Sequence, residues 1–205
     1  MKKILYAAMP MAVIASLSLN LISEPLPIGA SLPNPTQKMK STSGEEVSFK
    51  DVMGKNGLLV MFSCNTCPIV KKYDSRIIDV SKFALENNFG VILLNPNEAY
   101  RDNGDSYSDM IEYSKNLGYN WDYVMDNNSA MADVFGATRT PEVFLFDNVK
   151  ENSKLVYHGA IDDNQNGPDV VTRMHLLIAM KELMNGKEIS TKETRSVGCS
   201  IKRVK

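Results

Sequence analysis

Two cysteines lie two residues apart in the stretch FSCNTCPIV, residues 62–70, and a proline directly follows the second one. At this spacing Cys64 and Cys67 could form a redox pair, belong to a peroxidase site, supply half of a metal site or act as a structural staple. The chain has three cysteines, so at least one thiol is left over from any set of intramolecular pairs.

Dithiol exchange is the chemistry that this pattern favours. The thiolate is the reactive form of cysteine, and the N-terminus of a helix stabilises it. Pro68 suits the first turn of a helix, because its missing N–H costs nothing there. We therefore expect Cys64 to be exposed at the mouth of that helix, to have a lowered pKa and to attack. Cys67 should lie partly covered behind Cys64 and resolve the mixed disulfide.

The other uses of the cysteine pair have weaker support. A zinc site needs about four nitrogen or sulfur ligands, whereas the chain has one CxxC, the distant Cys199 and two histidines, His158 and His175. A staple across so short a loop removes little chain entropy. The stretch DDNQNG, residues 162–167, begins like a calcium loop but has Arg173 where glutamate is needed, so we interpret it as a polar turn. We expect no metal and no cofactor.

The third cysteine, Cys199, lies in the polar tail stretch GCSIK. About thirteen residues separate it from Gly186, and at roughly 3.3 Å per residue they span on the order of 40 Å. This reach exceeds the width of a domain of this size. We therefore interpret Cys199 as an additional redox thiol that forms an alternative disulfide, either with Cys64 or Cys67 during turnover or between two chains.

A strand, a helix and a second strand must position the CxxC pair. The apolar stretches GLLVMF, residues 57–62, and GVILLN, residues 90–95, suit strands buried on both faces. Between them, apolar residues recur at helical spacing from Ile69 to Ala84, and the pattern ends at Asn87. This order is typical of a βαβ unit with parallel strands.

The remaining segments continue the α/β pattern. We predict two short strands within residues 39–49, helices over residues 106–118 and 129–135, strands over residues 142–147 and 154–160, and a last helix over residues 169–185.

The N-terminal segment has the composition of a secretory signal. Lys2 and Lys3 precede a mostly apolar run from Ile4 to Ile22, with no acidic residue before Glu24. The run over residues 4–22 is just long enough to stay as a membrane tether. We therefore predict an extracytoplasmic protein of the periplasm or cell envelope, secreted or membrane-anchored, in a compartment where thiols tend to oxidise.

Length and charge limit the other function classes. The 205 residues suit one domain, and an apolar content of 43% is enough for a core. The net charge of −1 gives no basic footprint, so we expect no nucleic-acid partner. We predict a signal or anchor over residues 1–23, a linker over 24–36, a folded domain over 37–190 and a tail over 191–205.

The quoted pieces resemble the thioredoxin superfamily, and more closely its redoxin branch, named after alkyl hydroperoxide reductase and thiol-specific antioxidant proteins. The resemblance runs over residues 37–202 and rests on FSCNTCPIV, VILLNPNEAY, VMDNNSAMADVFGATRTPEVFLFD, LVYHGAIDDN and GCSIK. It implies an α/β thioredoxin-like fold, in which helices flank a central mixed β-sheet, with an N-terminal β-hairpin extension.

The resemblance also assigns site residues. In thioredoxin-like folds a cis-proline loop faces the active cysteines and presents backbone to the substrate, so we expect a cis bond at Thr140-Pro141 and a substrate groove shaped by both residues. Many thioredoxins carry a buried aspartate six residues before the first cysteine, where this chain has Leu58. Glu98 lies in a loop similar to one where tethered thioredoxin-like reductases place a glutamate. It is either a proton shuttle or a solvated loop acid.

Peroxiredoxins, in contrast, place a threonine or serine three residues before the peroxidatic cysteine and a proline four residues further back. Before Cys67 these positions hold Cys64 and Val60, and before Cys64 they hold Met61 and Gly57. Neither cysteine therefore matches the peroxiredoxin pattern.

We predict an exported thiol–disulfide oxidoreductase that acts on protein thiols and disulfides. A thiol-dependent peroxidase remains an alternative from the same fold, and a non-catalytic binding module remains an alternative from another class. The direction of electron flow and the oligomeric state stay open.

Overall fold

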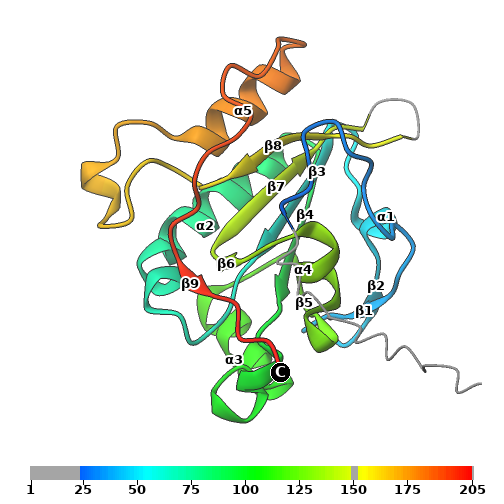
Figure 1. Cartoon of the computed structure of the whole chain (residues 1–205), viewed down its shortest axis with the longest axis vertical. Coiled ribbons are helices and arrows are strands. Elements are labelled where there is room, and N and C mark those ends of the chain that lie inside the picture. The colour runs from blue at the N-terminus through cyan, green and yellow to red at the C-terminus, as the bar shows by residue number, and fades with distance from the viewer. Residues whose placement is uncertain (1–23, 149–151, 205) are drawn as a thin grey trace, which may run out of the picture.

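A five-stranded mixed sheet forms the centre of the computed structural model, which describes residues 24–148 and 152–204 (Figure 1). The strand order is β5-β4-β3-β7-β8. β3, β4 and β5 are parallel, whereas β7 and β8 pair antiparallel to their neighbours. The bounds are β3 (Gly57–Phe62), β4 (Phe89–Asn95), β5 (Asp122–Met125), β7 (Glu142–Phe146) and β8 (Leu155–Gly159).

Alternating side chains of the central strands fill two cores, one on each face of the sheet. In β3, Leu59 and Met61 point into one core, while Leu58, Val60 and Phe62 point into the other. Because successive side chains of a strand point to opposite faces, an entirely apolar strand must be covered on both sides. All six residues of β3 are buried, as the apolar run predicts.

Helices cover both faces of the sheet. The first core contains residues of α2 (Pro68–Glu86), α3 (Tyr107–Leu117) and α5 (His175–Met184). The second contains Phe49 of α1 (Phe49–Val52) and Phe135 of α4 (Ala130–Phe135), whose rings lie 5.6 Å apart. Among the described residues, three short 3₁₀ segments complete the connections: η1 (Glu98–Asn103), η2 (Asn127–Ser129) and η3 (Pro168–Val170).

A small hairpin precedes the sheet. β1 (Met39–Lys40) pairs antiparallel with β2 (Glu46–Val47), as predicted for the N-terminal extension. Ser48 then caps α1, and Asp51 bonds back to the Ser48 N–H in a capping box that we did not predict.

The last helix begins later than predicted. Residues 168–170 form the 3₁₀ segment η3, and α5 starts only at His175, because Thr172 and Arg173 bond to Asp163 instead of continuing a helix. The Asp163 carboxylate accepts hydrogen bonds from the Thr172 N–H, at 3.0 Å, and from the Thr172 hydroxyl. The Asp163 N–H donates to the Arg173 carbonyl at 3.1 Å. These contacts hold the segment before α5 in an extended form. The edge strand β5 was not predicted either.

Both flanking segments lie against the domain. Within residues 24–36, predicted as a linker, the Leu26 and Gly29 N–H groups donate to the carbonyls of Phe135 and Leu155. Near the other end, β9 (Cys199–Ser200) pairs antiparallel with β6 (Arg139–Thr140).

The predicted signal or anchor over residues 1–23 and the tether over residues 4–22 lie outside the described residues. Within residues 24–148 and 152–204, none of the helices has the length and apolar character that crossing a membrane requires.

Candidate active site

The CxxC loop connects the end of β3 to the start of α2. Cys67 is the residue before the helix, with extended backbone angles φ −74° and ψ 120°, and Pro68 occupies the first helical turn. This arrangement follows from the proline, which favours extended backbone before it and helical backbone at its own position. Both cysteines therefore lie at the N-terminus of α2, as predicted.

The structure contains a disulfide between Cys67 and Cys199, and Cys64 is free. The two bonded residues are 132 positions apart in sequence, and their Cα atoms lie 6.0 Å apart. The sequence had left open several pairings for Cys199, and this is one of the intramolecular ones. Figure 1 shows how it arises: β9 crosses beside β6, close to the start of α2.

Cys64 differs from the sequence expectation. Its side chain is fully buried, and burial raises the pKa of its thiol, assisted by the nearby negative charge of Asp105. Hydrogen bonds from the Thr140 hydroxyl and from the backbone N–H groups of Thr66 and Cys67 act against this rise. The expectation of an exposed thiol with a lowered pKa is therefore wrong for this state, in which the cysteine lies inside the core.

Thr140 lies between the cysteines. The Thr140-Pro141 peptide bond is cis, as predicted. The Thr140 hydroxyl oxygen lies 3.2 Å from Cys64 Sγ, and its carbonyl oxygen lies 3.5 Å from Cys67 Sγ. The second distance is a contact and not a hydrogen bond, because a disulfide sulfur has no proton. Thr140 also pairs with Cys199 across the β6–β9 ladder. The residue before the cis-proline is thus surrounded by all three cysteines.

A buried aspartate, Asp105, holds the CxxC loop in place. The Asp105 carboxylate accepts hydrogen bonds from the Asn65 N–H at 2.8 Å and from the Thr66 hydroxyl at 2.7 Å. It also accepts from the side-chain amides of Asn95 and Asn97, at 2.8 and 3.0 Å. Asp105 has no solvent exposure. Asn95, which ends β4, and Asn97, two residues later, were the one sequence signal for this polar cluster.

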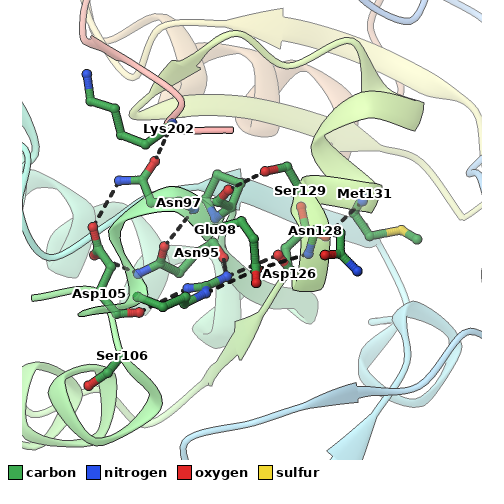
Figure 2. A network of polar contacts seen from close by, with 12 residues as sticks. Asn95, Asn97, Glu98, Asp105, Ser106, Asp126, Asn128, Ser129, Met131 and Lys202 are labelled. Carbon is green, nitrogen blue, oxygen red and sulfur yellow. Dashed lines mark hydrogen bonds and ion pairs between the residues drawn. The ribbon is translucent and has the colours of Figure 1, made fainter. Parts of the chain in front are cut away.

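The Glu98 carboxylate bonds to residues outside the CxxC loop (Figure 2). It accepts hydrogen bonds from the Asn128 N–H at 2.9 Å and from Arg101 Nε at 3.3 Å. Neither partner belongs to the CxxC loop. The role of Glu98 as a proton shuttle therefore stays a prediction, while Asp105 is the acid that contacts the loop directly.

The buried pair of Glu142 and His158 holds β6 in place. The Glu142 carboxylate accepts hydrogen bonds from the backbone N–H groups of Thr138 and Arg139, at 2.8 and 3.0 Å. Its other oxygen lies 2.8 Å from His158 Nε2, and both side chains are buried. His158 also stacks on Phe144, with ring centroids 4.4 Å apart. The pair thus orients the strand against which β9 lies.

Comparisons with known proteins agree with this architecture. An uncharacterized conserved protein from Geobacillus kaustophilus has 29% identity and a TM-score of 0.79, over 87% of this chain and 93% of that one. Two more distant structures share the fold, each with a TM-score of 0.52 and each over 65% of this chain and 84% of the other. They are a thiol:disulfide interchange protein, DsbE, from Chlorobium tepidum at 15% identity and a PrxQ mutant from Xylella fastidiosa at 13%.

These likenesses confirm the predicted thioredoxin-like fold. A search of curated proteins finds no match. The sequence model of the AhpC/TSA family matches residues 28–155, which is more than half of the chain and includes the hairpin, the CxxC loop and the cis-proline. The chain therefore belongs to the AhpC/TSA family of redoxins.

Proposed function

We propose that this redoxin is a thiol–disulfide oxidoreductase that exchanges disulfides with protein partners through Cys64 and Cys67. The observation that carries the proposal is the gathering of three cysteines around Thr140, next to a cis-proline and at the N-terminus of α2. Cys64 is the attacking thiol and Cys67 is the resolving thiol.

Three hydrogen-bond donors around Cys64 would stabilise a thiolate against the effect of burial, which raises the pKa of this thiol. In the reduced protein, Cys64 loses a proton and attacks a partner disulfide, so that a mixed disulfide forms and one partner thiolate leaves. Cys67 then attacks Cys64 Sγ, which releases the second partner thiolate and leaves a 64–67 disulfide. The Thr140 hydroxyl and the N–H groups of Thr66 and Cys67 stabilise the negative charge on Cys64.

A location outside the cytoplasm would suit the proposed disulfide exchange. We propose that the protein works outside the cytoplasm, because the lysines and the apolar run before Glu24 form the pattern of a secretory signal. A disulfide such as Cys67–Cys199 persists in oxidising compartments and is rare in the cytosol.

Peroxide reduction is the second candidate, and the burial of Cys64 is the observation that favours it. A peroxide is small enough to reach a covered thiol that a protein disulfide does not reach. In the fully reduced protein, hydrogen peroxide would oxidise Cys64 to a sulfenic acid and leave as water, and the Cys67 thiol would then condense with the sulfenic acid to give a 64–67 disulfide and a second water. The absence of the peroxiredoxin spacing before either cysteine places this candidate second.

Turnover measurements with the full-length chain test the proposal. We expect the protein to reduce insulin disulfides with dithiothreitol as electron donor, Cys64→Ser to lose this activity, and Cys67→Ser to accumulate mixed disulfides through Cys64. Thermal unfolding of each variant controls for loss of fold. Rapid peroxide consumption without insulin reduction would instead assign the peroxidase function.

A further inference from the structure

The segment Gly198–Lys202, here called the strap, covers the cis-proline loop. We propose that the strap occupies, within its own chain, the site at which an extended cysteine-containing segment of a partner binds, and that Cys64 releases it by displacing Cys199 from Cys67. This inference rests on the proposed function and adds to it the kind of segment that the site accepts.

Backbone pairing holds the strap as it would hold a peptide. Cys199 lies opposite Thr140 and Ser200 lies opposite Arg139 in an antiparallel ladder. The Ile201 N–H donates to the Thr138 carbonyl at 3.1 Å, which extends the pairing by one residue. An added strand binds through main-chain groups that every peptide has, so selectivity must come from its side chains. In this register the strap cysteine is bonded to Cys67, and Thr140, with which it pairs, also lies 3.2 Å from Cys64, the cysteine on which a partner's mixed disulfide would form.

Two positions of the strap define what the site accepts. A Cβ atom at Gly198 would lie 2.1 Å from the Thr140 carbonyl oxygen and 2.6 Å from the Thr140 carbonyl carbon. Both are backbone atoms, so the clash could be relieved only by moving the main chain. The residue before the cysteine must therefore be glycine. Two residues after the cysteine, Ile201 is 7% exposed and belongs to the core on the α4 side of the sheet. A partner segment should accordingly read glycine, cysteine, any residue, then an apolar residue.

The strap and the CxxC loop share one polar network (Figure 2). The Lys202 N–H donates to Asn97 Oδ1 at 2.9 Å, and the Asn97 side-chain amide donates to Asp105. Asp105 in turn accepts from Asn65 and Thr66 of the loop. Removal of the strap therefore breaks the hydrogen bond between Lys202 and Asn97. Asn97 and Asp105 connect this bond to Asn65 and Thr66, the two residues that follow Cys64.

The release step is a thiol–disulfide exchange within the chain. Cys64 gives up its proton to solvent and attacks Cys67 Sγ, so the 64–67 bond forms as the 67–199 bond breaks. Cys199 leaves as a thiolate and takes up a proton, and no external oxidant or reductant is consumed. The attacking sulfur lies 3.2 Å from the Thr140 hydroxyl oxygen and the attacked sulfur lies 3.5 Å from the Thr140 carbonyl oxygen, so both sulfurs lie beside the same residue.

Alkylation of the oxidised full-length protein tests the exchange. With one intramolecular disulfide formed, a single thiol remains: Cys64 when Cys67 and Cys199 are bonded, Cys199 when Cys64 and Cys67 are bonded, and Cys67 when Cys64 and Cys199 are bonded. Peptide mass spectrometry after iodoacetamide treatment and acid quench identifies it. We expect Gly198→Ala, which forces the strap away from Thr140, to raise labelling of Cys199 by at least about tenfold over wild type.

The matched control is Gly167→Ala, whose added Cβ meets nothing within 4 Å, and it should label as wild type does. Labelling confined to Cys64, at the same rate in wild type and in Gly198→Ala, would overturn the release step. Circular dichroism shows whether each variant is folded.

Peptides test what the site accepts. Reduced full-length Cys199→Ser should reduce the glutathione mixed disulfide of SVGCSIK at least about tenfold faster than those of SVACSIK and SVGCSSK, because only the first peptide satisfies both positions. Equal rates for the three peptides would overturn the assignment of the strap as a stand-in for a partner. If neither peptides nor insulin were reduced, the proposed function would fail, and the alkylation result would still decide whether Cys64 releases the strap.

Discussion

Burial and hydrogen bonding act in opposite directions on the Cys64 thiol. Burial raises its pKa, while the Thr140 hydroxyl lowers it. An enzyme that attacks through this thiol must lessen the first effect or strengthen the second. Once the strap is released and the 64–67 disulfide is reduced, burial would raise the pKa less, because water would reach the sulfur.

Removal of the Thr140 hydroxyl should raise the pKa of Cys64. A hydrogen bond from a hydroxyl to a thiolate stabilises the charged form, so Thr140→Val should shift this pKa upward. The measurement is the ultraviolet absorbance of the thiolate against pH in a Cys67→Ser, Cys199→Ser background, in which Cys64 is the one thiol. Thr138→Val, in the same loop, is the control. An unchanged pKa in Thr140→Val would show that the hydroxyl does not stabilise the thiolate.

Asp105 and Glu98 should differ in their effect on the pH dependence of exchange. Asp105 contributes a negative charge that raises the pKa of Cys64, so Asp105→Asn should move the pH profile to lower pH. The variant should also be less stable, by about 1–3 kcal/mol, because the amide replaces one acceptor oxygen of a buried carboxylate with a donor. Insulin reduction across pH gives the profile.

Glu98→Gln is the comparison for Asp105→Asn. Slower resolution by Cys67 together with a shifted profile in Glu98→Gln would assign the proton shuttle to Glu98. A profile identical to wild type would show that Glu98 serves only its bonds to Arg101 and Asn128.

At the scale of elements, buried strands were the most predictable part of the fold. β3 has the predicted bounds, because an apolar run between Gly57 and the cysteines leaves one way to bury it. β5 was missed because it is short and only its two central residues are fully buried. The start of α5 was misplaced because Asp163, which precedes the predicted helix, bonds Thr172, a residue that would have formed its first turns.

The start of α4 should give the protein a pH-dependent stability. Asp126 is 2% exposed and accepts hydrogen bonds from the Met131 and Ala132 N–H groups at 2.8 and 2.9 Å. Burial raises its pKa from 3.8 to about 6. The folded state therefore binds this proton more tightly than the unfolded state does. The resulting stability is complete below pH 3.8 and is lost as the pH rises through about 6.

Denaturant unfolding between these pH values should show the effect. We expect the unfolding free energy of wild type to decrease by an amount on the order of 3 kcal/mol as the pH rises across this window. Asp126→Asn should remove this component. Asp133→Asn, on the exposed side of the same helix, should retain it. If the unfolding free energy of Asp126→Asn decreased with pH as that of wild type does, the decrease would come from other titratable groups.

For the whole molecule, the sequence was enough for the thioredoxin-like order and for the residues around the cis-proline. It was not enough for the pairing of Cys67 with Cys199. Reach along the chain permits that contact, but the choice between Cys64 and Cys67 depends on where β9 lies beside β6. The sequence did not predict the burial of Cys64 either, because this burial depends on contacts between segments far apart in sequence.

The location of the protein is also a property of the whole chain. We expect residues 1–35, fused to a phosphatase that is active only outside the cytoplasm, to direct export of the reporter. The same fusion with Leu17→Arg and Leu19→Arg, which interrupts the apolar run, should stay inactive. A well-expressed but inactive wild-type fusion would rule out export by this segment.

The separation of Cys67 and Cys199 has a consequence for biosynthesis. A ribosome that adds 5–20 residues per second needs about 7 to 26 s to translate the 132 positions between them. Where thiols oxidise as the chain emerges, Cys64 is the one partner that Cys67 can meet during that interval. A newly made chain would thus carry the 64–67 bond first and acquire the 67–199 bond by later exchange. Each molecule would therefore begin with the strap detached. The fraction of chains that carry the 67–199 disulfide would increase with time after synthesis.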